Sequence, residues 1–118
     1  MLNLNNKKLT ARQLAIQVYK EVLLLVRKLS KEEIFNLTSQ IKRAALSVSN
    51  NIAEGAARKS VLERKRFYEV ARSSDVEVDN CFEVILTAEY LSKEEILKAE
   101  TIVEQIFKLL SAMIDNTK

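Results

Sequence analysis

Apolar residues recur at alternating intervals of three and four along nearly the whole chain. This spacing places one apolar stripe along the side of an α-helix. Four segments carry such a stripe, and each opens on a Ser or Thr followed three residues later by Glu or Gln, a pair that can satisfy two backbone N–H groups at a helix start. The four pairs are Thr10 with Gln13, Ser30 with Glu33, Ser60 with Glu63, and Ser92 with Glu95.

The stripes predict which residues of the four helices share a core. They are Ala11, Ala15, Val18, Val22, Leu25 and Leu29 in the first helix, Ile34, Leu37, Ile41, Ala44 or Ala45, Val48 and Ile52 in the second, Phe67, Ala71, Ser74, Val78, Cys81, Ile85 and Ala88 in the third, and Ala99, Val103, Ile106, Leu110 and Met113 in the fourth. Gly55 is expected to end the second helix in the left-handed conformation. Short joints make consecutive helices antiparallel. The prediction is an all-α, antiparallel up-down-up-down four-helix bundle over residues 10–115, after a frayed tail at 1–9.

The first and fourth helices carry more apolar residues than one core stripe requires. The first has a second stripe, and the fourth adds Ile102 and Leu109 to its core positions. Surplus apolar surface of this kind marks interfaces between proteins, and a homo-oligomer is predicted. A wide core face within one chain is the alternative. The predicted interface residues are Ile16, Tyr19, Leu23, Val26, Phe107 and Ile114.

Composition narrows the class of protein. A chain of 118 residues with no proline and one glycine is long enough for one core and lacks the turn residues of an all-β fold. The longest apolar run, Val22 to Val26, is far shorter than the roughly 18 residues of a membrane span. The polar first eight residues contain no apolar secretory segment. We therefore expect a soluble, cytoplasmic protein without membrane contact.

The sequence lacks the residues of several kinds of active site. It contains no histidine, which excludes Ser-His and Cys-His nucleophile pairs and the usual metal ligands of helical bundles. Cys81 is the only cysteine, so no internal disulfide forms, and its apolar neighbours predict a buried, inert thiol. The carboxylates at Glu100 and Glu104 are expected on an exposed face. The prediction is a protein without enzymatic activity, metal or cofactor.

Charge is distributed unevenly between the two halves of the chain. Residues 1–72 contain 15 Lys and Arg against six acids, a net charge of +9, whereas residues 73–118 contain four against ten, a net charge of −6. A compact basic patch attracts phosphate backbones by counterion release, and RNA or DNA is a predicted partner. The alternative is a solvated face that pairs with the acidic second half. The candidate nucleic-acid-binding residues are Lys42, Arg43, Arg58, Lys59, Arg64, Lys65, Arg66 and Arg72.

A polar line along the second helix is not explained by the core stripe. It comprises Gln40, Arg43, Ser47, Asn51 and Glu54. The line is either a solvent face or a hydrogen-bonded network against the third helix, where Ser73, Ser74 and Glu77 lie close together. We favour the network.

The same helix carries a run that resembles a known family. Residues 37–45 (LTSQIKRAA), then Ser47 and Val48, then residues 51–55 (NIAEG) are similar to the signature of the four-helix-bundle proteins encoded in 23S ribosomal RNA intervening sequences, also called S23 ribosomal proteins. The resemblance extends from about Ala11 to Leu110. A related branch is the accessory variability protein of diversity-generating retroelements, a pentamer that associates with a reverse transcriptase and nucleic acid.

This resemblance implies a homopentameric bundle with RNA or DNA binding. The residues that match the family motif are Gln40, Arg43, Asn51, Glu54 and Gly55. The chain departs from the pattern at residues 73–77, where Ser-Ser-Asp-Val-Glu stands in place of Gly-Ser, an apolar residue and Glu. The functional prediction is a non-catalytic oligomer that binds nucleic acid or a nucleoprotein complex. Its alternative is a scaffold that presents an apolar helical face to a partner enzyme such as a reverse transcriptase.

Overall fold

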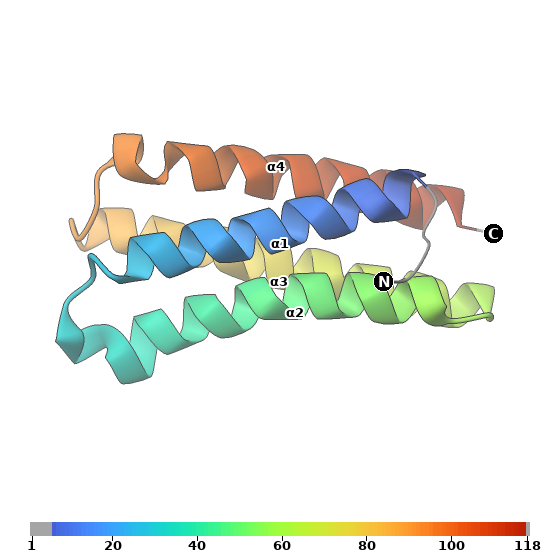
Figure 1. The fold of residues 1–118 in the computed structure, drawn as a ribbon, viewed down its shortest axis with the longest axis horizontal. Coiled ribbons are helices and arrows are strands. Elements are labelled where there is room, and N and C mark those ends of the chain that lie inside the picture. Colours follow the sequence, from blue (N-terminus) through green and yellow to red (C-terminus); the bar gives the residue numbers. More distant parts are fainter. Residues whose placement is uncertain (1–5, 118) are drawn as a thin grey trace.

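Four long helices pack side by side in the computed structural model, which describes residues 6–117 (Figure 1). The helices are α1 (Asn6–Val26), α2 (Ser39–Ala57), α3 (Val61–Thr87) and α4 (Lys93–Asn116). A 3-10 turn, η1 (Lys31–Glu33), and a π-helical turn, η2 (Ile34–Thr38), precede α2. Successive helices run in opposite directions, and the described residues contain no strand. The predicted all-α four-helix bundle is confirmed.

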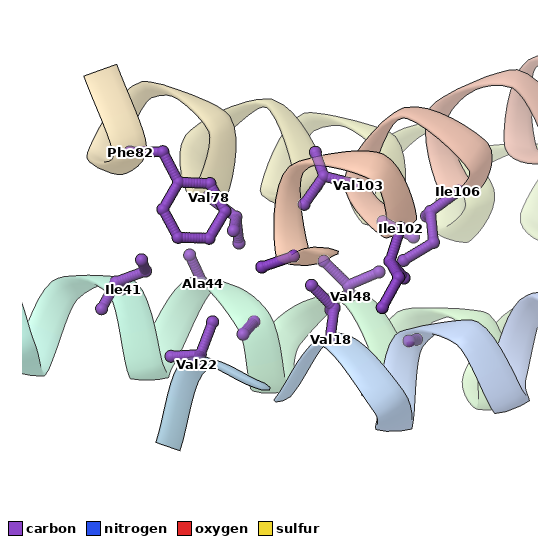
Figure 2. Close-up of a cluster of buried hydrophobic side chains, with 14 of the residues drawn as sticks. Val18, Val22, Ile41, Ala44, Val48, Val78, Phe82, Ile102, Val103 and Ile106 are labelled. Carbon is purple, nitrogen blue, oxygen red and sulfur yellow. The ribbon is translucent and has the colours of Figure 1, made fainter. Parts of the chain in front are cut away.

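The core runs along the axis of the bundle, and every helix contributes to it. Figure 2 shows buried side chains from all four helices, with Phe82 of α3 close to Ile41 and Ala44 of α2 and with Ile102, Val103 and Ile106 of α4 further along the bundle. The predicted core residues of α1 and α4 are all buried, and so are those of α2 except Ile34, which is exposed. Burial of one large aliphatic side chain contributes about 1.5–3 kcal/mol, so these stripes supply most of the favourable free energy of helix packing.

In α3 the buried stripe differs from the predicted one at alternate positions. Tyr68, Asp75 and Phe82 are buried where Phe67, Ser74 and Cys81 were expected, while Ala71, Val78 and Ile85 are buried as predicted. Both sets alternate intervals of three and four, so periodicity alone does not separate them. Burial of Phe82 in place of Cys81 removes more apolar area from water. Ala88 is exposed, because α3 ends at Thr87.

The predicted helix starts are correct for two helices. Ser60 Oγ accepts a hydrogen bond from Glu63 N at 3.3 Å, and Ser92 forms the reciprocal pair with Glu95. Ser30 Oγ accepts from Glu32 N at 3.2 Å and caps η1. The prediction for Thr10 is wrong, because α1 already begins at Asn6. Of the predicted tail, residues 6–9 are helical and residues 1–5 lie outside the described part.

The prediction of a left-handed Gly55 is also wrong. The helix continues to Ala57, and the φ of Gly55 is not positive. The left-handed residue of the described chain is Glu89, with φ 60°. Glu89 N donates to Leu86 O and Tyr90 N to Ile85 O, both at 3.0 Å, which is the hydrogen-bond pattern that commonly ends a helix.

Candidate nucleic-acid interface

The up-down topology gathers basic residues at one end of the bundle. The joint between α2 and α3 lies at the same end as the start of α1 and the end of α4 (Figure 1). We call this region the basic end, and its cationic residues are Lys7, Lys8, Arg12, Arg58, Lys59, Arg64, Lys65 and Arg66. The three residues of α1 were not among the sequence candidates. The predicted antiparallel order was the clue that could have placed them there.

Two arginines of the basic end hold the joint together. Arg64 Nη1 donates to the carbonyl oxygens of Arg58, at 3.2 Å, and Lys59, at 2.6 Å. These carbonyls follow the end of α2, where a cation also meets the negative end of the helix dipole. The Arg58 guanidinium pairs with Glu54 at 3.0 Å and lies over the Phe67 ring, 5.0 Å from its centre.

Other cations of the joint have no such contacts. Lys59 and Arg66 are exposed and Lys65 is half-buried. None of the three forms an ion pair with an acidic residue of the described chain. Arg66 and Phe67 line a shallow groove of about 400 Å³ together with Arg58, Glu63 and Val70. The joint therefore combines unpaired positive charge with an aromatic side chain.

The remaining candidates lie elsewhere, so the eight predicted residues do not form one patch. Lys42 and Arg43 are near the other end of α2, and Arg43 is roughly 22 Å from Arg58 at 1.5 Å per residue. Arg72 faces α4, where its Nη1 donates to Ser111 Oγ at 3.1 Å. Its guanidinium also lies 5.8 Å from the centre of the Phe107 ring. Arg72 thus joins α3 to α4.

Part of the polar line of α2 faces α3 and is hydrogen-bonded. Ser47 Oγ lies 2.9 Å from Ser74 Oγ, and either hydroxyl can donate. Asn51 Nδ2 donates to Ser47 O at 2.8 Å and to Ser47 Oγ at 3.0 Å. Gln40 and Arg43 are exposed. The network that was favoured from the sequence is therefore present at Ser47, Asn51 and Ser74, and the rest of the line is a solvent face.

Gly55 marks the closest approach of α2 to α3. A Cβ atom at this position would lie 2.6 Å from Tyr68 Cε1 and 3.1 Å from Phe67 Cβ. The Tyr68 ring is buried against the helix, and its hydroxyl has no hydrogen-bond partner. Glycine is thus required by the helix contact. The family-motif residues Asn51 and Gly55 serve the α2–α3 packing.

Only some of the residues predicted to form the oligomer interface are exposed on the surface of the chain. Ile16 is 52% exposed and Phe107 41% exposed, while Tyr19, Leu23 and Val26 are half-buried. Ile114 is buried within the chain, which corrects its assignment to an interface; Ile102, counted as surplus, is buried as well. These two side chains widen the core face of α4, as the alternative interpretation held.

An acidic cavity lies on the opposite side of α3 from Ser74. Its volume is about 440 Å³, and its lining residues are Asp75, Val76, Asp79, Leu97, Glu100, Thr101, Val103, Glu104 and Phe107. Asp75 is fully buried, and neither of its carboxyl oxygens has a hydrogen-bond partner among residues 6–117. Burial, reinforced by the charge of Asp79, raises the pKa of Asp75 from 3.8 to about 8.

Three further properties bear on function: the reactivity of the cysteine, the capacity to hold a metal ion, and the capacity of a helix to cross a membrane. Cys81 is half-buried, and burial with the nearby Glu77 raises the pKa of its thiol, which disfavours the reactive thiolate. Within residues 6–117, no three Asp, Glu or Cys side chains converge in a way that could hold a metal ion. In the described part of the chain, every helix is too short or too polar to cross a bilayer.

Comparison with known proteins assigns the family. A crystal structure from Bacteroides thetaiotaomicron VPI-5482, described as a protein of unknown function from the S23 ribosomal protein family, superposes with a TM-score of 0.85. It is 22% identical in sequence, and the match covers 93% of this chain and 99% of that one. No curated protein sequence matches. The profile of the 23S rRNA-intervening sequence proteins matches residues 7–112. The chain therefore belongs to the 23S rRNA-intervening sequence protein family.

Proposed function

We propose that this protein is a non-catalytic homo-oligomer that binds RNA or DNA through its basic end. The observation that carries the proposal is the convergence of α1 and the α2–α3 joint, which places eight cationic residues at one end of the bundle with few acidic residues between them. Lys59, Lys65 and Arg66 are not neutralised by ion pairs within the described chain.

Binding of this kind depends on charge and on shape. Lys and Arg side chains that approach phosphates release condensed counterions, so affinity falls as salt rises. Phe67 and the Arg58 guanidinium line the groove and offer a surface on which an unpaired base can stack. The arrangement favours single-stranded or looped nucleic acid over sequence-specific reading of a duplex, because a shallow groove does not reach base edges in the way a recognition helix does.

A fluorescence-anisotropy titration with labelled RNA and DNA oligonucleotides tests the proposal. The double variant Lys59→Ala, Arg66→Ala removes two unpaired cations from the joint. We expect weaker binding and a slope of log affinity against log salt that is smaller by about 1.5, since each lost phosphate contact removes about 0.7–0.9.

The matched control is the double variant Lys20→Ala, Arg27→Ala. Both side chains are exposed, and the variant changes the net charge by the same amount away from the basic end. Equal losses in the two variants would show that only net charge matters. No binding of the unaltered protein to either nucleic acid at low salt would remove the proposal.

The homo-oligomer, pentameric by family resemblance, is proposed to form through the outer face of α1. Ile16 is exposed, and Tyr19 and Leu23 lie beside it at three- and four-residue intervals. Replacing Ile16 with Glu is expected to shift the sedimentation coefficient to that of a single chain, whereas Val84→Glu on α3 leaves it unchanged. A single chain in the unaltered protein at micromolar concentration contradicts this step.

The same exposed apolar face favours a second candidate function, a scaffold for a partner enzyme such as a reverse transcriptase. A scaffold retains its partner after nuclease treatment, whereas partners bridged by nucleic acid are lost. Ile16→Glu should abolish partner retention by a scaffold, while a single chain of the variant keeps the cations of the joint and should still bind nucleic acid.

A further inference from the structure

The acidic cavity between α3 and α4 contains a polar group that the chain leaves without a partner. Asp75 is 0% exposed, and both carboxylate oxygens lack a hydrogen bond within the described residues. Burial raises the pKa of Asp75 to about 8, so the carboxyl is largely protonated near neutral pH, yet even a neutral buried carboxyl is costly without a hydrogen-bond partner. Other buried or half-buried polar side chains nearby, such as Ser47, Asn51 and Ser74, are hydrogen-bonded. Asp75 therefore remains available to a partner from outside the described residues.

The basic residues of α3 and α4 beside the cavity are engaged elsewhere. Arg72 lies one turn before Asp75, but its guanidinium bonds Ser111 and stacks over Phe107. Lys108 pairs with Glu104 at 3.1 Å. Neither forms an ion pair with Asp75 within 4.0 Å. The site holds a carboxyl group but lacks its counter-charge.

The walls of the cavity define the partner's chemistry. Asp79, Glu100 and Glu104 add three carboxylates around Asp75, so the lining is strongly acidic. Leu97, Val76 and Phe107 supply an apolar rim, and Leu97 is 60% exposed. The absence of converging metal ligands in the described residues disfavours a bare metal ion. An acidic floor beneath an apolar rim suits a cationic head on a hydrocarbon stem.

We propose that the acidic cavity binds a small organic cation, a guanidinium or primary ammonium group carried on a short hydrocarbon stem. The head donates hydrogen bonds to Asp75 and is held by the field of Asp79 and Glu100. The stem packs on Leu97 and the free face of Phe107. Because the Asp75 oxygens are closed off from water, the exposed rim side chains rotate to admit the head. The cavity volume of about 440 Å³ leaves ample room for a ligand of this size.

Isothermal titration of the full chain with n-butylguanidinium chloride tests this site. The neutral n-butylurea has nearly the same shape and serves as the paired probe. We expect saturable binding of butylguanidinium and none of butylurea. Asp75→Asn keeps the shape of the side chain and cannot become an anion when the cation binds, so it should weaken binding about tenfold or more. Glu83→Gln, an exposed carboxylate of α3 outside the cavity, should bind as the unaltered protein does.

A second variant keeps the test valid if Asp75→Asn changes the fold. Thr101 lines the cavity from α4 and is exposed, so Thr101→Arg can place a tethered guanidinium near Asp75. This variant should fold and should no longer bind butylguanidinium. The proposal is overturned if butylguanidinium does not bind the unaltered protein at millimolar concentration. It is equally overturned if Asp75→Asn, still folded by circular dichroism, binds with unchanged affinity. Neither result bears on nucleic-acid binding at the basic end.

Discussion

Ser74 and Asp75 are adjacent in α3, yet they face different helices and differ in how their polar atoms are satisfied. Ser74 turns toward α2 and hydrogen-bonds Ser47, which in turn accepts from Asn51. Asp75 turns into the core beside the acidic cavity and has no partner. The Ser47–Asn51–Ser74 network between α2 and α3 is thus satisfied by residues of the described chain, whereas the α3–α4 side contains a buried carboxyl that is not. The contrast separates polar residues that stabilise helix packing from one that the proposed ligand would satisfy.

The largest expected effect is a loss of stability with rising pH that depends on Asp75. Its pKa is raised from 3.8 to about 8 by burial and by Asp79, so the folded state holds this proton more tightly than the unfolded state does. The stabilising contribution is full below about pH 4 and is lost as pH rises toward about 8. The slope is at most about 1.4 kcal/mol per pH unit. Urea unfolding at several pH values measures it.

Two variants isolate this effect. Asp75→Asn should flatten the stability curve across the window, and Glu83→Gln should leave it as it is. Glu100 and Glu104 face the cavity from α4, but neither is the main cause of the raised pKa. Glu33 has the opposite effect on the stability curve. A hydrogen bond from Tyr90 lowers the pKa of its carboxyl, so its stabilising contribution is lost as pH falls. A curve for Asp75→Asn as steep as that of the unaltered protein would refute the assignment.

The next effect tests the closeness of the α2–α3 interface. Gly55→Ala places a Cβ 2.6 Å from the buried Tyr68 ring, and overpacking of this kind costs about 1–3 kcal/mol. At an unconstrained helix position the same substitution would stabilise by about 0.5–1 kcal/mol, so the sign of the change is decisive. Chemical denaturation gives the value. Asn50→Ala, an exposed neighbour on α2, should change stability by less than about 0.5 kcal/mol.

Gly55 also shows where prediction from sequence stops. A single glycine near the end of a helix suggested a left-handed terminus, yet the glycine serves a contact with a ring 13 residues away in sequence. Periodicity predicted the cores of α1 and α4 although both helices carry further apolar residues, and the predicted stripes are the ones that packing buries. In α3 two stripes fit the period equally well, and only the packing against α2 and α4 selects Tyr68, Asp75 and Phe82.

Only the part of the candidate site whose residues are close in sequence was predictable. Charge along the chain identified the α2–α3 joint, since consecutive residues stay close in space. Lys7 and Arg12 reach the basic end only through the antiparallel topology, and Arg72 is removed from it by its contact with Ser111. The acidic cavity was not predicted at all. Asp75 and Glu100 come from different helices, and the burial of Asp75 runs against its polarity.

A smaller effect is expected from the Ser47–Ser74 hydrogen bond. Each single substitution to Ala should cost about 1 kcal/mol, because it leaves the other hydroxyl with fewer partners. A double-mutant cycle should give a coupling of about 0.5–1 kcal/mol. The control is a double-mutant cycle on Ser49 and Ser73. Ser49 Oγ donates to Leu46 O of its own helix and Ser73 is exposed, so this cycle should give no coupling. No coupling between Ser47 and Ser74 would mean that the α2–α3 interface does not depend on this bond.

The smallest expected change concerns the Tyr68 hydroxyl on the α2 side of α3, which has no hydrogen-bond partner among the described residues. The Tyr68 hydroxyl is buried without a partner, but it is neutral, and burial raises its pKa further above neutrality. Tyr68→Phe removes the unpaired hydroxyl and keeps the ring against Gly55, so stability should stay the same or rise by up to about 1 kcal/mol. Tyr90→Phe is the control, because its hydroxyl donates to Glu33 at 2.8 Å and its loss should destabilise. Marked destabilisation by Tyr68→Phe would show that the hydroxyl has a partner outside the chain, and the two sides of α3 would then be alike.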